Sequence, residues 1–145
     1  MTHVEGHVSE RIFAALAVRT SNSTDAVETA AAVAALCEEI GQALAPIVGQ
    51  GGVAALYKRS LFLTARDHPM LSGLHADVQG VMDVSALTSR LTSLSQSDAA
   101  RVGAALLLSF YELLGSLVGS SLTERLLRSL WNRPLSDPPA SEASP

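Results

Sequence analysis

Three cations and one aromatic residue have the spacing of a single helix face within residues 53–67. Lys58, Phe62 and Arg66 follow one another at intervals of four residues, and Arg59 lies beside them. Residues four apart lie on the same side of an α-helix. An exposed ring among cations is suited to binding a protein partner, an acidic surface or a nucleic-acid base. The alternative is that Phe62 packs beneath another helix while the cations extend around it to solvent.

A second set of polar residues lies on an otherwise apolar stretch, residues 98–118. Arg101, Ser109, Glu112 and Ser116 share one narrow stripe at helical spacing, and the rest of the helix surface is apolar. We expect a buried polar seam, satisfied by hydrogen bonds or by an arginine from a neighbouring helix. A buried carboxylate beside hydroxyl groups is also a feature of functional sites. The alternative function is therefore a small-molecule-binding protein or enzyme with a pocket near Glu112.

The remaining residue types that ligate metals or attack substrates form no recognisable set. The histidines lack the spacing of a zinc site, and neither an HExxH motif nor a cysteine pair is present. Cys37, the single cysteine, falls on an apolar helix face between Val33 and Ile40, so we predict a small buried hydrophobe. No Ser–His–Asp set or carboxylate pair can be assembled. The sequence predicts no catalytic residues, no metal and no cofactor, and it favours a protein that is not an enzyme.

Helical periodicity runs through most of the chain, and no segment alternates as a β-strand does. Leucine and alanine, the best helix formers, supply much of the apolar content. The segment from residue 69 to 83 predicts a loop with room for one helical turn. The predicted helices are residues 3–19, 26–44, 53–67, 98–118 and 121–133, with a short helix capped by Asp83 or Ser85 that contains Leu87, Leu91 and Leu94. The first of them is either a helix or a loosely packed arm over residues 1–23.

Helix ends are marked by residues with a clear physical role. Thr24 or Asp25 should cap the second helix, because a side-chain oxygen there can accept a free backbone amide. Pro46 and the glycines of GQGG (49–52) should end or break that helix. Ser95 is followed three residues later by an aspartate and should cap the apolar helix. Ser121 and Glu124 have the spacing of a capping box and predict the start of the last helix.

The apolar stretch from residue 102 to 118 could be either a membrane span or a core helix. Its 17 residues reach about 25 Å as a helix, whereas a bilayer crossing needs about 20 apolar residues. Glu112 would lie near the bilayer centre, at a cost of about 2.5–3.5 kcal/mol. A helix that is apolar on nearly all sides is typical of the centre of a globular bundle. We therefore predict a core helix and no contact with a membrane.

The length and net charge of the chain limit the number of domains and the kind of partner. A chain of 145 residues is one ordinary domain, and we predict an all-α, single-domain bundle of five or six helices around the central apolar helix. Residues 1–133 form this domain, and residues 134–145 form a disordered tail rich in proline, serine and acids. The net charge of -4 makes nucleic acid an unlikely partner. We expect a soluble, cytoplasmic, non-catalytic interaction or regulatory module, such as an accessory protein in intracellular signalling, which binds a protein partner or forms a homodimer.

Overall fold

The regular structure described in the computed structural model is helical throughout. The structure describes residues 14–15, 25–80, 82–119 and 121–125. Its elements are α2 (Ala26–Asp67), the 3-10 turns η1 (Pro69–Leu71) and η2 (Leu74–Asp77), α3 (Ser85–Thr92) and α4 (Gln96–Val118). The predicted all-α class is confirmed. Apart from two helical residues, Ala14 and Ala15, the predicted N-terminal helix or arm lies outside the described residues, as does the predicted tail.

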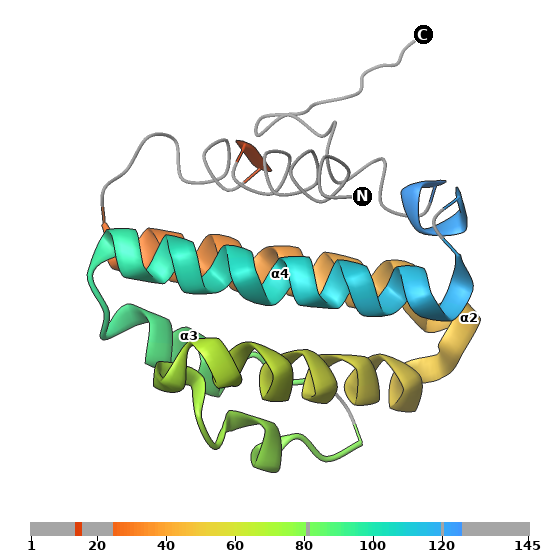
Figure 1. Ribbon diagram of the computed structural model, residues 1–145, viewed down its shortest axis with the longest axis horizontal. Helices are drawn as coiled ribbons and strands as arrows, with labels where there is room; N and C mark the ends of the chain where they lie inside the picture. Colours follow the sequence, from red (N-terminus) through yellow and green to blue (C-terminus); the bar gives the residue numbers. More distant parts are fainter. Residues whose placement is uncertain (1–13, 16–24, 81, 120, 126–145) are drawn as a thin grey trace, which may run out of the picture.

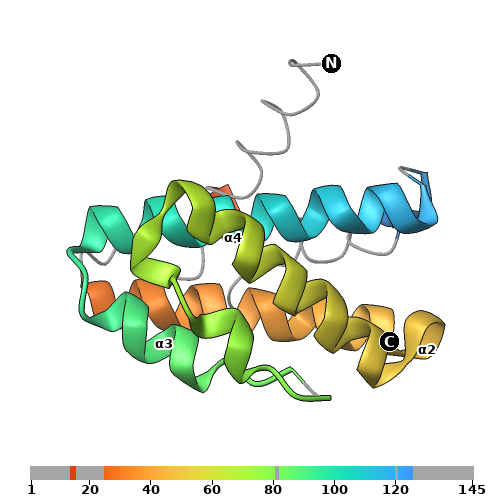
Figure 2. The same ribbon diagram turned by 60° about the horizontal axis from the view of Figure 1, so that its bottom comes forward.

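Helix α2 is bent sharply, so its two halves fold back on each other (Figures 1 and 2). Asp25 caps its start as predicted, because its carboxylate accepts the Val27 amide at 2.9 Å. Pro46 is accommodated within the helix, and the non-helical residue is Gly49, with φ 79° and ψ 164°. Glycine adopts a positive φ without the steric cost that a side chain imposes. The bend divides α2 into a first arm, residues 26–48, and a second arm, residues 50–67.

Helix α4 packs along both arms of α2 and completes the core (Figure 1). Ser95 caps its start as predicted, because its hydroxyl accepts the Asp98 amide at 3.1 Å. The ring of Phe110 is fully buried, and its centroid lies 6.4 Å from that of Tyr57 on the second arm. The buried residues of α4 form one face of the helix: Ala99, Val102, Gly103, Ala104, Leu106, Leu107, Phe110 and Leu114.

The segment predicted as a loop with one helical turn contains two, η1 and η2, and α3 fixes it against the bundle. Arg90 of α3 donates from Nη1 to the carbonyls of Met70, at 2.7 Å, and Ser72, at 3.2 Å. These bonds satisfy carbonyls at the end of η1 that have no helical partner. The carboxylate of Asp83 accepts the Ser85 amide at 2.9 Å at the start of α3. This hydrogen bond lowers the pKa of Asp83.

The polar stripe on α4 is not the buried seam that the sequence predicted. Arg101, Glu112 and Ser116 are exposed, and Ser109 is half-buried. The physical reason is that both arms of α2 lie against the apolar face of α4, which leaves the stripe on the outer side. Helix α4 contributes eight buried residues to the core as predicted, but the described helices leave its polar stripe uncovered.

A short helical turn, residues 121–125, follows α4 at the place where the sequence predicts the start of the last helix. The Thr123 amide donates to the Gly119 carbonyl at 3.1 Å, and residues 121–125 are helical. Ser121 therefore lies inside the turn and does not cap it. Glu124 does not complete a capping box either, because its carboxylate accepts a hydrogen bond from the Tyr111 hydroxyl. This bond joins the turn to α4.

Helices α2 and α4 are both long and apolar enough to cross a membrane by length and composition alone. Core helices of soluble proteins often meet the same two conditions. In the described structure the apolar faces of α2 and α4 pack against each other.

Replacing Gly103 with alanine should destabilise the protein, because α4 and the first arm of α2 touch at this residue. A Cβ atom at Gly103 would lie 2.4 Å from Cγ2 of Val33, so the two helices would have to separate. We expect the free energy of unfolding to fall by about 1–3 kcal/mol, the usual cost of overpacking a core. Urea denaturation followed by circular dichroism measures this change.

Gly51 provides the matched control. It is also helical, and a Cβ atom there would meet nothing within 4 Å. Gly51→Ala should leave stability unchanged or raise it by up to about 1 kcal/mol, because alanine favours the helix. Equal effects of the two substitutions would show that the helices do not approach closely at Gly103.

Candidate functional site

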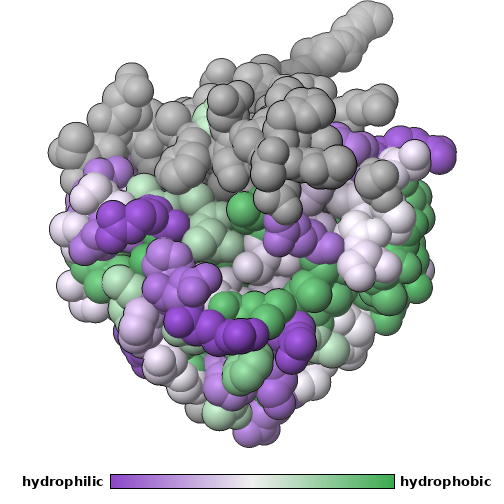
Figure 3. All heavy atoms as spheres, viewed as in Figure 1, coloured by the Kyte–Doolittle hydropathy of each residue, from purple (hydrophilic) through white to green (hydrophobic). Residues whose placement is uncertain are grey.

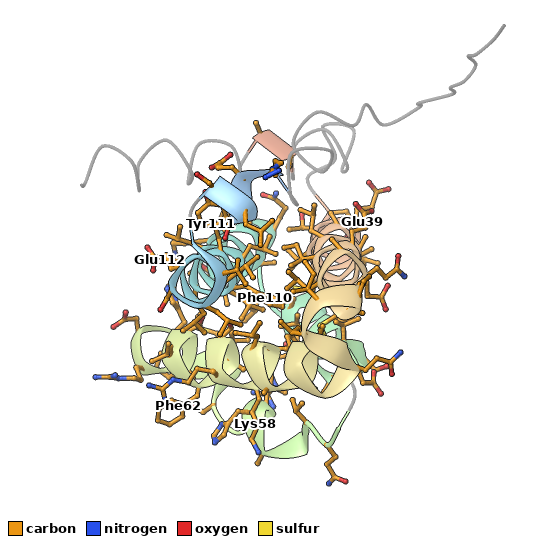
Figure 4. The ribbon with its side chains drawn as sticks, turned by 90° about the vertical axis from the view of Figure 1, so that its right-hand side faces the viewer. Glu39, Lys58, Phe62, Phe110, Tyr111 and Glu112 are labelled. Carbon is orange, nitrogen blue, oxygen red and sulfur yellow. The ribbon has the colours of Figure 1, made fainter. Side chains whose placement is uncertain are left out.

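Lys58, Arg59, Phe62 and Arg66 form an exposed patch on the second arm of α2, here called the Phe62 surface. Lys58 and Phe62 point away from α4, on the opposite side of the arm (Figure 4). The Phe62 side chain is 41% exposed. Of the two interpretations of the sequence, burial of Phe62 beneath another helix is therefore wrong for the described structure.

The ring of Phe62 is held in place although it is exposed. The ring of His75, from η2, packs against that of Phe62 in a T-shaped arrangement, with centroids 5.3 Å apart and an interplanar angle of 72°. The guanidinium carbon of Arg59 lies 5.6 Å from the ring centroid, within the range of a cation–π interaction. Nδ1 of His75 is buried without a hydrogen-bond partner in the described part of the chain. An aromatic ring held in this way loses little conformational entropy when it binds.

The two arms of α2 carry charge of opposite sign. The second arm holds the cations of the Phe62 surface and a single acid, Asp67, at its end. The first arm holds Glu28, Glu38 and Glu39 and has no lysine or arginine. The face of the molecule that includes the second arm shows hydrophilic side chains around hydrophobic ones (Figure 3). The Phe62 surface is therefore a positive patch with an apolar centre.

The structure does not gather the predicted polar stripe of α4 into a site. The hydroxyl of Ser109 lies 3.2 Å from that of Thr64 on the second arm, where it accepts a hydrogen bond. Arg101 instead contacts Asp98 on its own helix, at 2.5 Å, as an exposed ion pair. Glu112 points outward, away from the core around Phe110 (Figure 4). Ser109 and Arg101 therefore make separate local contacts, and none of the four side chains lines the cavity found in the described structure.

Other candidate residues do not assemble a metal site or a nucleophile. Within residues 25–80 and 82–119, no group of three or more His, Cys, Asp or Glu side chains could hold a metal ion. Cys37 is buried in the core as predicted. Burial, with a smaller contribution from the charge of Glu38, raises the pKa of the Cys37 thiol to about 12. Because the thiolate is the reactive form, this cysteine is not suited to catalysis.

Two features of the structure were missed in the sequence. The contact of His75 with Phe62 joins two different elements, and no periodicity connects a 3-10 turn to a helix face. A cavity of about 280 Å³ near the bend of α2 was also not foreseen. The only signal for the cavity was the break at GQGG, which indicated a turn but not what the turn brings together.

The described fold and surface define a class: an all-α protein with an aromatic ring among exposed cations. The particular family is not shown. Comparison with known protein families, with curated proteins and with solved structures finds no match for this chain. The function proposed below therefore derives from the residues of this chain alone.

Phe62→Ala should destabilise the protein far less than Phe110→Ala, because the two rings differ in burial. Deleting a fully buried aromatic ring costs about 3–5 kcal/mol, and this applies to Phe110. Phe62 loses only part of its surface to its neighbours, so we expect about 1–2 kcal/mol, by area bookkeeping. Urea denaturation of both variants measures the difference. A loss of stability at Phe62 as large as that at Phe110 would place the ring in the core.

Cys37 should react with a thiol reagent only when the protein opens. At pH 8 the buried thiol, with a pKa of about 12, is protonated and inaccessible. A chromogenic disulfide reagent releases one coloured thiolate for each cysteine that it modifies. Because the chain contains one cysteine, complete reaction releases one equivalent per molecule. We expect slow release from the native protein and rapid release in guanidinium chloride. Rapid release from the native protein would contradict the burial of Cys37.

Proposed function

We propose that the protein is a non-catalytic helical interaction or regulatory module that binds a protein partner, or a second copy of itself, through the Phe62 surface. The observation that carries the proposal is the exposed ring of Phe62, held by His75 and Arg59 among cations. Aromatic and arginine side chains contribute most of the energy of many protein interfaces. We also propose that this protein is soluble and cytoplasmic and acts as an accessory protein in intracellular signalling.

The chemistry of the surface favours one kind of partner. Three cations around an apolar centre match a partner that presents carboxylates around an apolar pocket or ridge. The rest of the chain is acidic, with a net charge of -4, so a long polyanion such as nucleic acid would be repelled by most of the molecule. A second copy offers the carboxylates of its own first arm. An acidic protein surface is thus the partner that the proposal names.

The solubility included in the proposal is supported by the packing of the apolar helices. The large side chains Tyr57, Phe110 and Leu114 are fully buried between α2 and α4. A protein whose apolar faces cover each other needs no lipid to cover them. Recovery of the protein in the supernatant without detergent would support this part of the proposal, and its quantitative recovery with membranes would contradict it.

Charge reversal tests the Phe62 surface directly. Lys58→Glu with Arg66→Glu should abolish association while leaving the helical circular dichroism spectrum unchanged, because both side chains are exposed. Phe62→Ala should weaken the same association. Sedimentation velocity detects self-association, and a quantitative pull-down from the native cell, comparing wild type with the variants, detects another protein.

A matched control reverses two exposed arginines outside the surface, Arg101→Glu with Arg125→Glu, and changes the net charge by the same amount. This control should bind like the wild type. Association that is equally weak in both double variants would mean that net charge alone governs it. The proposal would be contradicted if the wild type is a monomer and if the wild type and all variants capture the same proteins.

A further inference from the structure

A cavity of about 280 Å³ lies between the two arms of α2, close to the bend at Gly49. Its walls come from three places in the chain: the end of the first arm, the start of the second arm, and the segment just before α3. It shares no residue with the Phe62 surface. The bend therefore builds a second concave feature whose chemistry is separate from the function proposed above.

The inner part of the cavity is apolar and depends on a glycine. Ala45, Val53 and Met82 contribute its apolar side chains, and Gly41 lies among them. A Cβ atom at Gly41 would lie 2.9 Å from Cε of Met82 and 3.1 Å from Cγ1 of Val53. A larger residue would therefore push the methionine or the second arm away. With glycine, the three elements approach closely and still leave room for a short apolar group.

The rim of the cavity is polar and carries a single sign of charge. Glu38 and Gln42 are four residues apart on the first arm and so lie on the same side of the helix. Gln50, at the start of the second arm, also lines the cavity. Together they offer one carboxylate and two carboxamides, and the residues described as lining the cavity include no lysine, arginine or histidine. A carboxylate with neutral hydrogen-bonding neighbours selects a cation.

We propose that this cavity binds a small organic ammonium ion, with the ammonium group at Glu38 and a short apolar chain against Val53 and Met82. The volume is slightly below the range of about 300–1,000 Å³ that is usual for sites of drug-sized ligands. The ligand is therefore a small amine, and its dissociation constant lies in the millimolar range, as expected for a few non-hydrogen atoms.

Three probes of equal length separate charge from apolar contact: pentylammonium chloride, 1-pentanol and sodium pentanoate. Titration into the labelled protein is followed by amide chemical shifts, with Gly41 and Val53 as reporters. Pentylammonium should bind saturably, 1-pentanol at least tenfold more weakly, and pentanoate not at all. Glu38→Gln should weaken pentylammonium binding at least tenfold and leave 1-pentanol unchanged. Its matched control, Glu28→Gln, removes an exposed carboxylate from the same helix away from the cavity and should change nothing.

A further variant tests the location without removing charge. Ala45→Phe fills the cavity from a half-buried position, so it should abolish binding of both pentylammonium and 1-pentanol while α2 stays helical. Equal binding of the three probes, or pentylammonium binding that Glu38→Gln does not weaken, would overturn the proposal. Binding that persists in Ala45→Phe, or the absence of saturable pentylammonium binding to the wild type, would overturn it as well.

Discussion

The bend of α2 at Gly49 is the constraint on which the rest of the structure depends. A backbone with φ 79° and ψ 164° reverses the direction of a helix that would otherwise be a single long rod. Once the two arms face each other, they form the surface that the apolar face of α4 covers. The same reversal leaves the outer side of the second arm free to present Phe62, and it forms the cavity, which is open to solvent, between the two arms. Gly49, with its positive φ, thus determines where the core, the Phe62 surface and the cavity lie.

Close packing of α4 on the first arm makes this arrangement specific. Gly103 allows Val33 to approach the helix backbone, and Tyr57 packs against Phe110 from the second arm. The interface of α4 with the second arm also contains a hydrogen bond between hydroxyls, which buried Thr64 donates to half-buried Ser109. Because an unpaired buried hydroxyl is costly, this contact favours one register of α4 against the second arm over others.

Local signals in the sequence were sufficient for most helix ends, and the face of a helix that the core covers was harder to predict. Asp25 and Ser95 cap their helices as expected, because a cap involves only neighbouring residues. The break attributed to Pro46 and the glycines occurs at Gly49, the residue of α2 with non-helical φ and ψ, whereas Pro46 lies inside the helix. The sequence predicted correctly that the polar residues around Glu112 share one side of α4, but it predicted wrongly that this side is buried. Periodicity shows which residues share one side of a helix. Which of its sides is buried depends on how the other helices pack against it.

The opposite charges of the two arms of α2 have a consequence for how the protein moves toward other molecules. The first arm carries Glu28, Glu38 and Glu39, and the second carries Lys58, Arg59 and Arg66. Two such arms give the described part of the molecule separate regions of negative and positive charge, even though the net charge of the chain is only -4. In the field of a charged surface the molecule turns before it makes contact, at distances up to about one Debye length, about 8 Å at physiological ionic strength. Its orientation at encounter is therefore set by electrostatics, and it would be lost in concentrated salt.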